Sequence, residues 1–176
     1  MDLLSEINRE KLRPFLKEIC SKYQRVPYHN FTHAFSLARI AYWIIRKKKK
    51  KKFFIKDDIL AIIIACIAHD LNHPGMNNSY MVKSKNFMAL IYNDASVLEN
   101  MHTSLLFQIL NNDKYNILDT LNRERYNYIR ENIIESIIYT DMSKHDQLCS
   151  KLKELNEYNK QEKSMRIFLT SMLVHA

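Results

Sequence analysis

Two pairs of histidines, each four residues apart, interrupt otherwise apolar stretches of this 176-residue sequence. His29 and His33 stand in VPYHNFTHAF, and His69 and His73 stand in IACIAHDLNHPG, where Asp70 follows the first histidine. Residues four apart share one face of a helix, so each pair can direct two imidazoles to one point. Imidazole nitrogen suits zinc, and carboxylate oxygen suits magnesium or manganese. The spacing therefore predicts a site for divalent metal ions.

A third polar group, Glu99 with His102, lies in the apolar segment VLENMHTSLLFQIL. A single histidine on an apolar helix face is most often a core residue that is hydrogen-bonded to the backbone, and H-D-x-x-H alone leaves that interpretation open. Three such groups are harder to explain in this way, because buried ionisable groups without partners are costly and a shared metal would compensate them. Gly75, the one glycine of the chain, lets the backbone turn tightly after the second histidine pair.

The composition favours a single all-α domain. One glycine and three prolines are too few for the tight turns of an all-β protein, and 47% hydrophobic residues can supply a core. The formal charge is +8, but six consecutive lysines at 47–52 account for most of it, so we expect no nucleic-acid partner. The longest apolar run, at 59–68, is shorter than the ~20 residues that a membrane span needs. Three scattered cysteines are typical of a reducing compartment.

Helical periodicity predicts the elements that must position the polar groups. The most apolar helix is expected to include His69 and Asp70 near its end, and a basic loop is expected at 46–52. The predicted helices are 3–23 with a break before Pro14, then about 30–46, 59–71, 77–84, 86–92, 94–110, 119–140, 143–158 and one from 164 onwards.

Four motifs resemble those of the class I 3',5'-cyclic nucleotide phosphodiesterases and occur in that family's order. YHNFTHAF is similar to the Y-H-N-x-x-H-A element, and HDLNHPGMNNSY is similar to the H-D-[apolar]-x-H-x-G-x-x-N signature. ALIYNDASVLEN and TDMSKH resemble two further elements. The resemblance implies a compact all-α, multi-helix domain of the HD type. It identifies residues 1–176 as a partial phosphodiesterase catalytic domain, with the motifs at 28–145.

The resemblance also implies a role for each motif residue. His33, His69 and Asp70 would be zinc ligands, and Asp70 would bridge to a second ion, magnesium or alternatively manganese. His29 would be the general acid in the hydrolysis of cyclic GMP, cyclic AMP or both to 5'-monophosphates. The remaining candidates are His73, Glu99 and Thr140, which would hold waters of the second ion, and Tyr28, Asn78 and His102, which would line the substrate pocket.

The match has gaps. The family usually has Asp where this chain has Asn72 and His where it has Met101, but neither position would be a metal ligand. The final SMLVHA resembles the start of an element that continues, in the family, to a last zinc-binding Asp. We therefore expect a domain incomplete at its C-terminus, with exposed apolar helix faces and little or no turnover by this chain alone.

Two other interpretations remain open. A non-catalytic, truncated relative would keep the helical scaffold and act by binding, and zinc stoichiometry would distinguish it from an enzyme. Another nucleotide hydrolase of the HD superfamily would share the histidine-aspartate core, but it has no reason to contain ALIYNDASVLEN or TDMSKH. The expected partner is a cyclic nucleotide, with dimerisation left open. The expected location is the cytoplasm, or the cytoplasmic face of a membrane if the parent protein has a membrane region.

Overall fold

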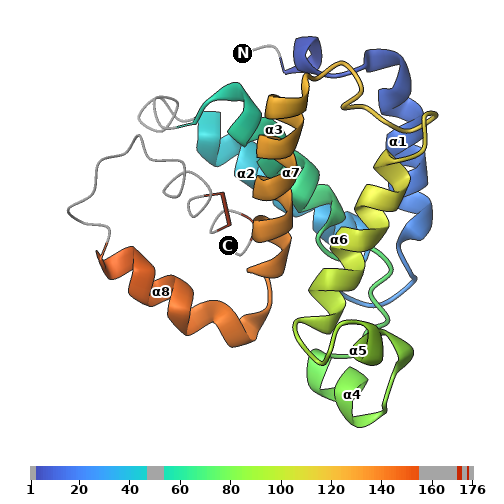
Figure 1. Ribbon diagram of the computed structural model, residues 1–176, viewed down its shortest axis with the longest axis vertical. Helices are drawn as coiled ribbons and strands as arrows, with labels where there is room; N and C mark the ends of the chain where they lie inside the picture. The colour runs from blue at the N-terminus through green and yellow to red at the C-terminus, as the bar shows by residue number, and fades with distance from the viewer. Residues whose placement is uncertain (1–2, 47–53, 155–169, 172–173, 175–176) are drawn as a thin grey trace.

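The computed structural model describes residues 3–46, 54–154, 170–171 and 174. Every regular element in this part of the chain is a helix, which confirms the predicted all-α class (Figure 1). In chain order the elements are η1 (Leu4–Glu6), α1 (Arg9–Lys22), α2 (Phe31–Arg46), α3 (Lys56–Ala68), α4 (Asn78–Lys83), α5 (Phe87–Ile91), α6 (Val97–Leu110), α7 (Arg123–Ile138), η2 (Met142–Lys144) and α8 (His145–Glu154).

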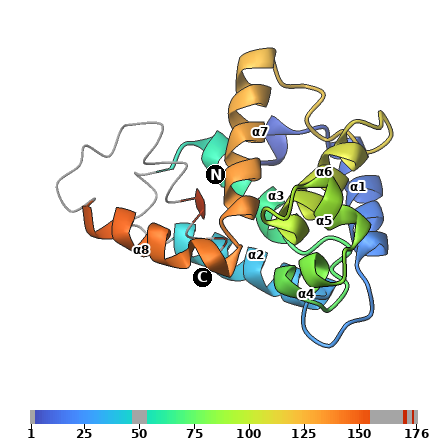
Figure 2. The ribbon, with the colours of Figure 1, turned by 60° about the horizontal axis from the view of Figure 1, so that its bottom comes forward.

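Helix α3 is the centre of the core. It contacts α2, α6 and α7, and ten of its 13 residues are buried. A helix that is apolar on all sides is stable only when other elements surround it, so α3 requires these neighbours. Figure 1 and Figure 2 both show α8 leaving the end of α7 and extending away from α4 and α5. None of the described helices is long and apolar enough to cross a membrane.

Carboxylates at the start of α3 tie it to η1 and α7. Arg125 of α7 donates to both carboxylate oxygens of Asp57, at 2.6 and 3.1 Å, and to Glu6 of η1 at 2.8 Å. The neighbouring Asp58 is fully buried; it accepts the Tyr128 hydroxyl at 2.5 Å and a backbone N–H at 2.9 Å. The two carboxylates at the start of the most apolar helix are therefore partnered, mainly by side chains that lie far away in the sequence.

The first predicted helix is divided at residues 7–8, so the predicted break before Pro14 is wrong. Asn8 caps α1 by accepting the backbone N–H of Glu10, and Pro14 lies inside the helix. A proline in a helix removes one backbone hydrogen bond. Here the burial of Phe15 and Ile19, both 0% exposed, keeps the helix continuous against the core.

The other helices begin and end within a few residues of the predicted bounds. Several large apolar side chains are exposed, notably Phe35 and Trp43 on α2 and Phe87 on α5, the last with 71% of its surface exposed. Of the predicted basic loop, positions 47–52 lie outside the described residues. So do the end of the predicted 143–158 helix and most of the segment from 164 onwards.

We expect Glu6→Gln to lower the free energy of unfolding near pH 7 by about 1 kcal/mol, the upper range for a solvent-accessible ion pair. Hydrogen bonds from Lys56 and Arg125 lower the pKa of Glu6 from 4.5 to about 2. Because the folded-state pKa is lowered, this contribution is present above the unfolded-state pKa and is lost as the pH falls towards 2.

Urea unfolding of the wild-type and Glu6→Gln proteins, followed by circular dichroism, should therefore give stabilities that converge between about pH 4.5 and the acid limit. Glu10→Gln, at an exposed position of α1, is the matched control and should change little at either pH. A wild-type advantage that stayed constant down to about pH 2.5 would contradict the assignment.

Candidate functional site

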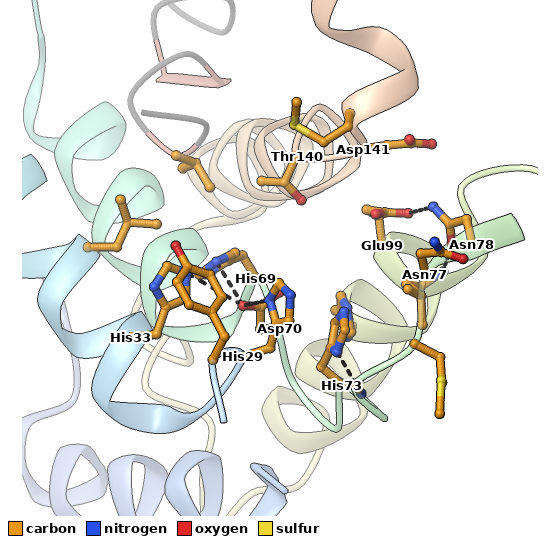
Figure 3. Close-up of a pocket in the computed structure, with 18 of the residues that line it drawn as sticks. His29, His33, His69, Asp70, His73, Asn77, Asn78, Glu99, Thr140 and Asp141 are labelled. Carbon is orange, nitrogen blue, oxygen red and sulfur yellow. Dashed lines mark hydrogen bonds and ion pairs between the residues drawn. The ribbon is translucent and has the colours of Figure 1, made fainter. Parts of the chain in front are cut away.

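A cavity of about 690 Å³ is lined by all ten residues that the sequence singled out (Figure 3). Its wall combines the start of α2, the turns after α3, the start of α4, the first turns of α6 and the end of α7. The ten are Tyr28, His29, His33, His69, Asp70, His73, Asn78, Glu99, His102 and Thr140. Because the turns after α3 lead directly into α4, these residues come from four segments, which lie far apart in the sequence and meet at this cavity.

The predicted extension of helix 59–71 through His69 and Asp70 is wrong, because α3 ends at Ala68. Two successive tight turns follow: Leu71 N–H donates to Ala68 C=O at 3.1 Å, and His73 N–H donates to Asp70 C=O at 3.0 Å. The proline after His73 disfavours helical backbone at that residue. The second histidine pair therefore does not share a helix face, and the turns bring both rings to the cavity.

The first histidine pair lies at the beginning of a helix. Asn30 accepts the backbone N–H groups of Thr32 and His33 at 3.0 and 3.2 Å, so α2 starts just after it. This places His33 in the first turn and His29 before the helix. The Tyr28 ring lies against both imidazoles, with ring centroids 4.5 Å from His33 and 5.0 Å from His29. Tyr28 itself is 64% exposed, at the rim of the cavity.

The carboxylate of Asp70 is the point on which three imidazoles converge. Its Oδ2 lies 3.0 Å from His29 Nδ1, 3.2 Å from His69 Nε2 and 3.7 Å from His33 Nε2 (Figure 3). Burial alone would raise the pKa of Asp70. Hydrogen bonding and positive charge from His69, with further contributions from nearby histidines, hold that pKa well below its usual range instead. Asp70 is therefore a charged acceptor at neutral pH.

His69 is oriented by the backbone of the helix that precedes it. Its Nδ1 lies 2.9 Å from the carbonyl of Cys66 and donates to it, which directs Nε2 at Asp70. Burial acts to lower the pKa of His69, but the Asp70 carboxylate outweighs burial and raises it. Burial lowers the pKa of His33, the third member of this group. A histidine whose second nitrogen is held by a backbone carbonyl is the usual arrangement of a metal ligand.

His73 and His102 lie deeper in the same cavity. His73 Nδ1 accepts the backbone N–H of Gly75 at 3.0 Å, and its ring stacks on His29 with centroids 3.8 Å apart. His102 donates from Nδ1 to the Leu71 carbonyl at 2.5 Å. Burial lowers the pKa of His73 to about 4 and that of His102 to about 3, so both rings are neutral at pH 7. His102 Nε2 is buried with no hydrogen-bond partner in the described part of the chain.

Glu99 and Thr140 form the wall opposite the histidines. Asn78 donates from Nδ2 to Glu99 Oε2 at 2.9 Å, and burial raises the pKa of Glu99. The Thr140 hydroxyl donates to the carbonyl of Ile137 at 2.7 Å, which leaves its lone pairs for a donor in the cavity. Carboxylate and hydroxyl oxygens thus line this side, whereas imidazole nitrogens line the other.

Two residues near this wall had no role in the sequence analysis. Asp141, 7% exposed, lines the cavity; its Oδ2 accepts the Ser96 hydroxyl at 2.7 Å and its Oδ1 accepts the backbone N–H of Ser143. Asp141 stands in the TDMSKH motif, so its position was a usable signal. Ser96 stands in the ALIYNDASVLEN motif, but its contact with Asp141 depends on a left-handed backbone conformation with φ of 42°, which the motif does not predict.

The donor atoms form two groups, each of which could hold a metal ion. Within the described residues, ligand atoms of His33, His69 and Asp70 all lie within 4.8 Å of one another, and so do those of His29, Asp70 and His73. Two imidazole nitrogens and one carboxylate oxygen are a typical zinc donor set. Asp70 belongs to both groups, and a carboxylate with two oxygens can contact an ion on each side.

The chain resembles known proteins along most of its length. Residues 28–176 match the family model described as 3'5'-cyclic nucleotide phosphodiesterase. The high-affinity cGMP-specific 3',5'-cyclic phosphodiesterase 9A of Drosophila melanogaster is 38% identical over 146 residues, which are 83% of this chain and 10% of that protein. The 3',5'-cyclic-nucleotide phosphodiesterase regA of Dictyostelium discoideum is 37% identical over 169 residues, 94% of this chain and 21% of that protein.

A solved structure shares the fold. The phosphodiesterase domain of the RhoPDE fusion protein from the choanoflagellate Salpingoeca rosetta superposes with a TM-score of 0.93 at 32% identity. The superposition covers 98% of this chain and 56% of that one, so the chain spans about half the length of the solved domain. Sequence motifs, family model and three-dimensional fold agree, and the chain belongs to the 3',5'-cyclic nucleotide phosphodiesterase family.

Proposed function

We propose that the chain forms the metal-binding part of an enzyme that hydrolyses 3',5'-cyclic nucleotides to 5'-nucleoside monophosphates. The observation that supports this most strongly is the Asp70 carboxylate, which two groups of metal-ligand atoms share inside one cavity. Two similar proteins are named as a cGMP-specific and as a cyclic-nucleotide phosphodiesterase, so the proposal includes cyclic GMP and cyclic AMP.

His33, His69 and Asp70 would hold a zinc ion, and Asp70 would also contact a magnesium ion, with manganese as an alternative. When bound, the two ions would neutralise charge on the phosphate and lower the pKa of a water molecule between them. Glu99 and Thr140, on the opposite wall, would accept hydrogen bonds from waters of the second ion. His73, whose Nδ1 accepts the Gly75 N–H, would instead donate from Nε2 to such a water.

His29 would donate a proton to the 3' oxygen that leaves phosphorus. Its Nδ1 lies 3.0 Å from Asp70, which fixes the ring and leaves Nε2 for the substrate. The His73 ring, stacked at 3.8 Å, fixes the plane of the imidazole. The His29 side chain is 38% exposed, so a substrate can reach it from the mouth of the cavity. Proton donation by a positioned histidine contributes typically 10²–10⁴-fold to a rate, by order of magnitude.

Asp70→Asn should lower the affinity of the chain for zinc by at least about 100-fold, because it replaces the charged ligand that both groups share. Isothermal titration of the EDTA-treated chain with zinc measures this change. Asp119→Asn makes the same substitution at an ion pair with Lys11, neither residue of which lines the cavity, and this variant should bind zinc like the wild-type chain. A folded wild-type chain that retains no zinc would favour the non-catalytic scaffold instead.

The roles of the metal site and of His29 can be separated with two phosphodiesters. Bis(p-nitrophenyl) phosphate needs no purine pocket and releases an acidic phenol that requires no proton. We expect slow, metal-dependent hydrolysis of this ester by the chain, abolished by EDTA or by Asp70→Asn and nearly unchanged by His29→Gln. Turnover of cyclic GMP or cyclic AMP by the 176-residue chain is expected to be low, because the chain spans about half of a solved domain.

In a longer form of the protein that is active on cyclic nucleotides, His29→Gln should lower kcat by roughly 10²–10⁴-fold. Equal losses on both esters would contradict the role of His29 as proton donor and would indicate a role in metal binding.

A further inference from the structure

The N-terminus of α6 is capped by a residue from another helix. Ser96 occupies the N-cap position, but its φ of 42° and ψ of 54° are left-handed and its side chain makes no cap hydrogen bond. The side-chain oxygen of Asn78, the first residue of α4, accepts the backbone N–H of Leu98 at 2.9 Å instead. The free N–H groups in the first turn of a helix need such acceptors.

The amide nitrogen of Asn78 holds the carboxylate of Glu99, the residue that follows Leu98. Asn78 Nδ2 donates to Glu99 Oε2 at 2.9 Å (Figure 3). An amide presents one acceptor and one donor in a single plane, so one side chain fixes the Leu98 backbone and the Glu99 carboxylate together. Asn78 holds Oε2, and Glu99, 8% exposed, lines the cavity.

Capping by Asn78 also leaves Ser96 available for a second contact. The Ser96 hydroxyl donates to Asp141 Oδ2 at 2.7 Å, and Asp141 follows Thr140 directly. If Ser96 capped its own helix in the usual way, its hydroxyl would be turned to the backbone of α6. Because Asn78 caps α6 in place of Ser96, and Ser96 binds Asp141 instead, α4, α6 and the end of α7 are linked around the oxygen-lined wall of the cavity.

We propose that Asn78 is a positioning residue for Glu99: it holds one carboxylate oxygen and directs the other towards the second metal ion. This inference rests on the proposed function, in which Glu99 binds the waters of that ion. It gives Asn78 a task that acts through a neighbouring side chain and requires no contact with the substrate.

The test is a double-substitution cycle with Asn78→Leu and Glu99→Gln. The zinc-loaded chain is titrated with Mn²⁺, and free Mn²⁺ is measured by electron paramagnetic resonance. If Asn78 acts through Glu99, Asn78→Leu lowers the affinity for Mn²⁺ by roughly 10–100-fold, the usual effect of losing a group that orients a metal site. Adding Asn78→Leu to Glu99→Gln should then lower the affinity no further.

Asn122→Leu is the matched control. Asn122 caps α7 by accepting the Arg125 N–H at 2.9 Å, at the end of that helix opposite Thr140. The Asn122→Leu variant loses a helix cap through the same substitution, so its melting temperature should fall about as much as that of the Asn78→Leu variant. Its affinity for Mn²⁺ should stay at the wild-type value. Asn78→Ser, whose side chain is too short to reach both partners, replaces Asn78→Leu if the latter does not fold.

The outcomes are distinct. Wild-type affinity for Mn²⁺ in folded Asn78→Leu or Asn78→Ser would overturn the inference and leave Asn78 as a helix cap. Effects of the two substitutions that multiply would overturn it also, because Asn78 would then act independently of Glu99. A zinc-loaded wild-type chain that binds no Mn²⁺ would overturn the proposed two-ion site, and the inference with it.

Discussion

A buried carboxylate surrounded by imidazoles is the interaction on which the arrangement of this protein depends. Asp70 follows the most apolar helix of the chain, where a charge without partners would be strongly unfavourable. The partners are His29, just before α2, His33, in the first turn of α2, and His69, in the turn after α3. The packing of α2 on α3 therefore serves two purposes: it buries apolar surface, and it brings histidines to the charge of Asp70.

The site is built from helix ends, and its side chains are held by backbone atoms. His69 donates to the Cys66 carbonyl and His102 to the Leu71 carbonyl, while His73 accepts the N–H of Gly75. Each of these bonds uses Nδ1 and leaves Nε2 for the cavity. The ring orientations are thus fixed by the folded backbone itself, which lowers the cost of assembling a metal site.

The sequence predicted the helices and the members of the site, but not the geometry that joins them. Helix α3 and the stripe of α2 follow from long apolar patterns, and the ten candidate residues named from the motifs and from the spacing of Glu99 and His102 all line the cavity. The end of α3 at Ala68 was missed because its periodicity continues to Leu71, while the turns depend on local backbone bonds. The contacts of Asn78 and Ser96 join helices far apart in the sequence, and no local pattern encodes such contacts.

The scarcity of glycine has a consequence for which substitutions this sequence can tolerate. In the described part of the chain, left-handed backbone occurs at Gly75 and at five other residues, Asn72, Lys85, Asn93, Asp94 and Ser96. Asn and Asp accept this conformation more readily than other residues, whereas Lys does so at a cost of about 1–2 kcal/mol. Lys85, between α4 and α5, is thus a place where mutation to glycine is tolerated. Gly75 has the opposite status: with φ at 78°, any side chain there strains the loop that holds His73, so we expect substitutions at this position to disturb the metal site.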